Sequence, residues 1–197
     1  MTTHETSPDT HHDVYSKTVF GFWLYLLTDF MLFATIFAAY AVLNGNTFGG
    51  PTPKTLFNLD YTTLQTFILL VSTFAASVGG AYAHRKSKGG TILFFLISFV
   101  LGAVFLGMEF HEFSHLIAAG SGWEKNAFAS AFFSLVGMFQ FHLIIALLWL
   151  ILLLIPVFRS GVSGRSVLRL TCLRMFWQFL NIVWVFIYTL VYLLGVA

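Results

Sequence analysis

Five long runs of apolar residues, separated by short polar breaks, account for most of the chain. A helix needs roughly 20 mostly apolar residues to cross about 30 Å of hydrocarbon. Because every backbone polar group in such a segment must be paired internally, the runs are expected to be helices. The runs that meet this length are residues 19–43, 62–84, 91–117, 127–158 and 167–196. The pattern therefore predicts an all-α fold, a five-helix transmembrane bundle without an internal repeat.

The composition agrees with a protein that has lipid as its solvent. Hydrophobic residues make up 58% of the 197 residues and charged residues only 9%, whereas soluble domains carry about 25% charged residues. The net charge of +2 is too small to indicate nucleic acid, and one cysteine, Cys172, excludes an intrachain disulfide. The start of the chain lacks the basic segment and cleavage site of a signal peptide. We expect residues 1–18 to form a polar, flexible cytoplasmic tail and residues 19–197 a single transmembrane domain.

Basic residues are distributed unequally between the two sides of the predicted bundle. Only Lys54 and Lys125 lie in the first and third connections. The other eight lie in the tail, in the second and fourth connections or just inside the last helix: Lys17, Arg85, Lys86, Lys88, Arg159, Arg165, Arg169 and Arg174. Lysine and arginine accumulate on the cytoplasmic side of membrane proteins. The bias predicts a cytoplasmic N-terminus and, with five helices, a C-terminus on the outside.

Small residues recur four apart in the second run, at Ser72, Ala76 and Gly80. Such spacing lets two helix backbones approach closely. We therefore expect this face to pack against either a sister helix or a helix of a partner chain.

One set of polar residues is expected near the middle of the bilayer. It comprises Asp29 in the first run, His142 in the fourth, and Gln178 and Asn181 in the fifth. An unpaired carboxylate at that depth is strongly disfavoured, so it either finds a partner or is neutralised. We expect Asp29 to point into the bundle and to bond a polar residue of the fourth or fifth helix, with His142 as the first choice. The alternative is a protonated Asp29 that faces lipid and bonds only its own helix.

A second set lies towards the outer end of the third run and comprises Glu109, His111, Glu112 and His115. The last three match H-E-x-x-H, in which two histidines bind zinc and the glutamate acts as a base. A catalytic zinc also needs a third protein ligand, and none is evident downstream. We expect hydrogen bonding or ion pairing at this end, with no metal; an intramembrane zinc metalloprotease is the remote alternative.

Four segments, taken together, resemble subunit III of the haem-copper respiratory oxidases. They are FGFWLYLLTD at residues 20–29, GMEFHEF at 107–113, Gly137 with His142, and FWQFLNIVW at 176–184. The first contains a membrane-embedded carboxylate, and the second resembles the family's pattern of two glutamates around an aromatic residue. The short five-helix form is most similar to the bo-type ubiquinol oxidases.

The chain departs from the family pattern in two places. Phe139 and Gln140 replace a histidine and a glycine in the fourth run, while Gln178 and Asn181 replace a histidine and an aspartate in the fifth. These changes remove ionisable groups but keep polar side chains in the fifth run. A hydrogen-bonding role for this run therefore remains expected, whereas a proton-carrying role is not.

The resemblance implies a subunit without a redox centre of its own. Haem and copper would belong to subunit I, which oxidises quinol and reduces oxygen while protons are pumped. This chain would support the assembly and stability of subunit I in a bacterial plasma membrane. Its partners would be subunits I and II, subunit IV where the complex has one, and bound phospholipid. The alternatives are an accessory chain of a nitric oxide reductase or cytochrome c oxidase, or a small transporter, for which repeats or helices broken near mid-depth are missing.

Overall fold

The computed structural model describes residues 10–44, 59–118, 122, 124 and 127–196, with side chains between residues 15 and 195. The long helices of this part are α1 (Thr10–Leu43), α3 (Leu59–His84), α4 (Lys88–Ala118), α5 (Ala127–Ser160) and α6 (Gly164–Ile187). Helix α6 continues into a π-helical turn, η1 (Tyr188–Leu193), and a short α7 (Leu194–Val196). Among the described residues, five helical segments are long and apolar enough to span a membrane, so the predicted five-helix, all-α fold is confirmed.

Two helix boundaries differ from the prediction. Helix α1 begins at Thr10 rather than at residue 19, so residues 10–18 of the expected tail are helical. This stretch contains neither glycine nor proline, and extending an existing helix costs far less than starting one. The predicted last helix is also interrupted by the π-helical turn Tyr188–Leu193, which apolar periodicity does not reveal. Residues 1–9 of the tail lie outside the described residues.

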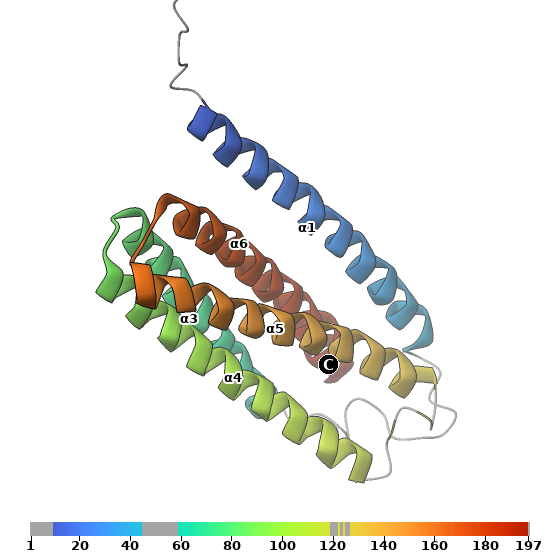
Figure 1. Ribbon diagram of the computed structural model, residues 1–197. Coiled ribbons are helices and arrows are strands. Elements are labelled where there is room, and N and C mark those ends of the chain that lie inside the picture. Colours follow the sequence, from blue (N-terminus) through green and yellow to red (C-terminus); the bar gives the residue numbers. More distant parts are fainter. Residues whose placement is uncertain (1–9, 45–58, 119–121, 123, 125–126, 197) are drawn as a thin grey trace, which may run out of the picture.

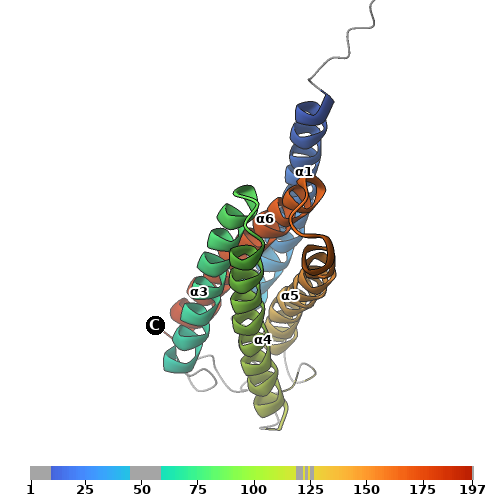
Figure 2. The same ribbon diagram turned by 60° about the vertical axis from the view of Figure 1, so that its left-hand side comes forward.

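Helix α6 lies between α1 and the helices α3 and α5 (Figure 1). It packs against α3, α5 and α1, while α3 and α4 form the most extensive helix pair. Helix α1 packs mainly on α5 and α6 and extends beyond the other helices at its N-terminal end (Figure 2). The start of α1, the turn between α3 and α4 and the turn between α5 and α6 all lie at one end of the molecule (Figure 2). The basic connections of the sequence are therefore at the same end.

The turn between α5 and α6 is built from residues suited to helix ends. Gly161 adopts φ +77°, a left-handed conformation that glycine adopts without strain. Ser163 is the N-cap of α6, where its Oγ accepts a hydrogen bond from the Ser166 backbone N–H at 3.2 Å. Together these residues reverse the chain within a few positions and place α6 beside α5.

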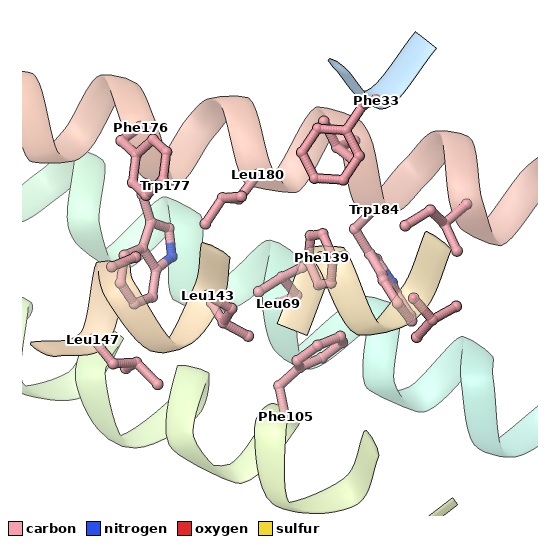
Figure 3. Close-up of a cluster of buried hydrophobic side chains, with 14 of the residues drawn as sticks. Phe33, Leu69, Phe105, Phe139, Leu143, Leu147, Phe176, Trp177, Leu180 and Trp184 are labelled. Carbon is pink, nitrogen blue, oxygen red and sulfur yellow. The ribbon is translucent and has the colours of Figure 1, made fainter. Parts of the chain in front are cut away.

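Two tryptophans of α6 are the largest side chains of the core (Figure 3). The ring of Trp184 packs edge-on against Phe105 of α4, with ring centroids 4.7 Å apart. Its Nε1 donates to Thr66 Oγ1 at 3.0 Å, and Trp177 Nε1 donates to Ser72 Oγ at 3.2 Å. A buried indole N–H is costly unless it is bonded. The two hydroxyls of α3 therefore hold α6 in register.

The small-residue face of α3 packs against sister helices of the same chain. Ser72 Oγ donates to the Ser98 carbonyl of α4 at 2.9 Å. A Cβ atom added at Gly79 would lie 3.0 Å from the Phe95 ring, and one at Gly80 would lie 3.0 Å from the Arg174 side chain of α6. A larger residue at Gly79 would press on the Phe95 ring of α4, and one at Gly80 would displace the Arg174 side chain. The sequence analysis expected this face to pack against either a sister helix or a partner chain. In the structure it packs against the sister helices α4 and α6.

Candidate functional site

The structure brings Asp29 of α1 and His142 of α5 together inside the bundle. Both side chains are buried, and His142 Nε2 lies 3.9 Å from Asp29 Oδ2. This separation lies within the distance limit for an ion pair, which needs a protonated His142, and is longer than a hydrogen bond. Tyr25, one turn before Asp29, also interacts with its carboxyl group. His142, the expected partner of Asp29, therefore lies next to it, but their nearest nitrogen and oxygen atoms are farther apart than the expected hydrogen bond.

The environment of His142 determines where its ring hydrogen lies. Its Nδ1 is 2.8 Å from the Met138 carbonyl oxygen, one turn earlier in α5. A carbonyl oxygen can only accept, so Nδ1 carries the hydrogen and Nε2 faces Asp29. Phe33 lies against the imidazole, with ring centroids 5.1 Å apart.

Gln178 and Asn181 do not join this pair, contrary to the expected four-residue cluster. Gln178 is exposed, and its Nε2 donates to Ser77 Oγ of α3 at 3.3 Å. The Asn181 Oδ1 atom is buried without a hydrogen-bond partner in the described part of the chain. The reason is the rotation of α6 about its own axis. Phe179 contacts Phe33 of α1 and Phe176 contacts His142 of α5, so Gln178 faces α3 instead.

A second buried cluster surrounds the glutamates of α4. Glu109 is completely buried, and its Oε2 accepts a hydrogen bond from Gln140 Nε2 of α5 at 3.3 Å. Glu112 is half-buried and accepts a bond from Gln65 Nε2 of α3 at 3.5 Å. The fully buried Tyr192 of η1 interacts electrostatically with both glutamates. Hydrogen bonding by Glu109 and Glu112, expected from sequence, is thus supplied by two glutamines.

Sequence reasoning missed Gln65 and Tyr192 and noted Gln140 only as a departure from the family pattern. The two glutamines cannot ionise and Tyr192 is neutral at pH 7, so a search for groups charged at that pH passes over all three. A signal was nonetheless present, because Gln65 and Gln140 are amides inside otherwise apolar runs. A buried amide needs a partner as a carboxyl group does. Matching the depths of amides and carboxyls would have pointed to these contacts.

We expect Gln140→Leu to lower the stability of the folded chain by about 1–3 kcal/mol, the usual cost of leaving a buried polar atom unpaired. The Glu109 Oε2 atom would lose the donor that the structure gives it. The measurement is the midpoint of heat-induced aggregation in mild-detergent extracts. Phe141→Leu, at the exposed neighbouring position, is the control; equal effects of the two changes would contradict the role of this bond.

The two histidines of the H-E-x-x-H stretch do not converge with the glutamates. His111 and His115 are both exposed, whereas Glu112 faces Gln65. Among the described residues, no group of three His, Cys, Asp or Glu side chains could hold a metal ion. We expect the purified complex to contain no zinc that depends on these histidines. Stoichiometric zinc that is lost in a His111→Ala, His115→Ala double variant, measured by elemental analysis, would favour the metalloprotease interpretation.

Comparison with known proteins places the chain among respiratory oxidase subunits. The family model for cytochrome c oxidase subunit III matches residues 2–196. A cytochrome bo(3) ubiquinol oxidase subunit 3 from Pseudomonas aeruginosa is 47% identical, over 95% of this chain and 90% of the relative. A quinol oxidase subunit 3 from Bacillus subtilis is 35% identical, over 91% and 88%.

A cytochrome c oxidase subunit 3 from Alkalihalophilus pseudofirmus is 39% identical, over 90% of this chain and 86% of the relative. These three relatives thus include subunits named for quinol and for cytochrome c oxidases, and each matches along most of its length. The matched region contains every described helix and both buried clusters. The chain belongs to the cytochrome c oxidase subunit III family, and it is a multi-pass membrane protein.

Proposed function

We propose that the chain is the non-redox subunit III of a proton-pumping ubiquinol oxidase of the haem-copper family. The observation that carries this proposal is the 47% identity, over nearly the full length of both chains, to a ubiquinol oxidase subunit 3. Haem and copper would belong to subunit I, and this chain would support the assembly and stability of that subunit. The two buried clusters fit such a role, because each ties together helices that are distant in sequence.

The complex would also contain subunit II, subunit IV where present, and bound phospholipid, in a bacterial plasma membrane. The bacterial relatives support this location. The N-terminus would be cytoplasmic and the C-terminus outside. This orientation is supported by the basic turns between α3 and α4 and between α5 and α6, which lie at the same end as the start of α1 (Figure 2).

Purification of the tagged chain from its native membranes tests the assignment. We expect it to elute with a larger membrane protein whose visible absorption spectrum shows haem, and to show no haem once it is separated from that partner. The matched control is the same tag on an unrelated multi-pass protein of the same membrane. Elution of the intact chain without any haem-bearing partner would overturn the proposal.

Topology is tested by introducing single cysteines for Lys86 and Lys54 into a chain in which Cys172 is replaced by serine. A membrane-impermeant maleimide added to intact cells should label position 54 and leave position 86 unlabelled until the membrane is opened. The reason is the eight-to-two distribution of basic residues. The reverse labelling pattern would require the opposite orientation.

A cytochrome c oxidase subunit is the second candidate, because the Alkalihalophilus pseudofirmus relative carries that name. The two candidates differ in the electron donor of the complex and not in the expected fold of this chain. The donor is used by a partner subunit, so only an assay of the whole complex separates them.

A further inference from the structure

Helix α6 has an exposed face between α1 and α3, which includes Gln178, Ile182 and Val185 and is called the trough below. Helices α1 and α3 both pack against α6 and flank it. On the α1 side, Phe30, Phe37 and Phe186 line part of an apolar cavity of about 250 Å³. On α6 itself, Ile182 and Val185 are exposed, 54% and 40% respectively. An apolar trough of this kind can hold either lipid chains or a helix.

The α3 side of the trough is polar, which distinguishes between these occupants. Gln178 is exposed and lies near the middle of the 30-residue span Gly164–Leu193. Its Nε2 bonds Ser77 Oγ, and Ser77 in turn donates to the Thr73 carbonyl at 2.9 Å. Within the described part of the chain, the Gln178 Oε1 atom accepts no hydrogen bond. An amide oxygen facing acyl chains stays unpaired, because hydrocarbon offers no donor.

Arg174 lies on the same side of α6, one turn closer to the basic end of the molecule. Its side chain covers Gly80 of α3, and its Nε atom is buried without a hydrogen-bond partner in the described residues. A lipid phosphate could approach an arginine near the interface. It could not reach Gln178, which is about 6 Å deeper at about 1.5 Å per residue. Only a protein side chain satisfies the deeper position.

We propose that a transmembrane helix of another subunit packs into the trough over α6 and donates a side-chain hydrogen bond to Gln178. This proposal rests on the proposed function, since it requires the chain to be part of a multi-subunit complex. The partner helix carries an amide or hydroxyl at the depth of Gln178 and an apolar surface towards Ile182 and Phe186. Such polar contacts between helices are a common means of association in membranes.

Photo-crosslinking in the assembled complex tests this surface. A photoreactive amino acid at Val185 lies two turns beyond Gln178 on the same face of α6, and one at Leu152 of α5, 64% exposed, is the control. We expect a crosslink from position 185 to another subunit of the complex, several-fold stronger than the same crosslink from position 152. In a Gln178→Leu background, the yield from position 185 should fall at least threefold.

Other outcomes would overturn the proposal in distinguishable ways. An intact haem-bearing complex in which position 185 crosslinks only to lipid, or to a second copy of this chain, contradicts the surface and leaves the proposed function standing. An unchanged yield in the Gln178→Leu background contradicts the hydrogen bond. Absence of any haem-bearing partner contradicts the proposed function and the surface together. The crosslink from position 185 in the otherwise unchanged chain does not depend on how well the Gln178 variant folds.

Discussion

Replacing Gly102 by leucine is expected to disrupt the packing of the bundle core. A Cβ atom at this position of α4 would lie 2.8 Å from the Trp177 ring and 3.3 Å from Leu147 Cδ2. Leucine adds three further carbons where even one does not fit. Overpacking a close-packed core typically costs about 1–3 kcal/mol. Displacement of Trp177 would also break its hydrogen bond to Ser72, which adds to the loss.

The measurement is the amount of chain that remains in the assembled complex after mild-detergent extraction and heating. Gly107→Leu provides a matched control, because it makes the same change in α4 at a glycine whose Cβ would have no neighbour within 4 Å. We expect the Gly102 variant to be lost at a clearly lower temperature and the Gly107 variant to behave as the unchanged chain. Equal stability of the two variants would contradict the close packing of Trp177 against Gly102 of α4.

The second large effect is expected at the Asp29–His142 pair. His142→Leu leaves a buried carboxyl group without its neighbour, and removing one member of a buried pair costs about 3–5 kcal/mol in water-soluble proteins. The Asp29→Leu, His142→Leu double variant removes both polar groups and leaves an apolar contact between α1 and α5. We therefore expect the double variant to be more stable than His142→Leu alone.

A double-mutant cycle measures this coupling from thermal midpoints of the two single variants, the double variant and the unchanged chain. Coupled neighbours usually differ from additivity by about 0.5–3 kcal/mol. Strict additivity would show that the two groups do not interact despite their 3.9 Å separation. A second cycle between His142 and Gln178 serves as the comparison. His142 contacts Asp29 of α1 and Gln178 contacts Ser77 of α3, so the stability changes of these two variants should add.

Apolar run length was sufficient to predict the five helices, because a lipid environment demands long segments with internally paired backbones. The length of these runs did not predict where the helices begin and end. Extension of α1 back to Thr10 depends on local helix propagation through polar residues, which hydropathy does not measure. The π-helical turn at Tyr188–Leu193 inserts an extra residue into the helical repeat. Its position depends on packing, since Tyr192 is fully buried next to the glutamates of α4.

Depth along the helices predicted the Asp29–His142 pair, but it could not predict the separation of Gln178 and Asn181 from that pair. Residues at equal depth meet only if their helices also turn them towards each other. The orientation of α6 is set by the indole bonds of Trp177 and Trp184 to hydroxyls of α3, which sequence alone does not reveal. The same bonds direct Gln178 towards α3.

The central claim is that the chain is a subunit of a ubiquinol oxidase, and oxygen uptake by the tag-purified complex tests it most directly. Uptake is measured with ubiquinol and, separately, with reduced cytochrome c as the only electron donor. The account predicts a haem-bearing complex that consumes oxygen with ubiquinol and not with cytochrome c. A haem-bearing complex that uses only cytochrome c, or a purified chain that supports no oxygen uptake with either donor, would contradict it.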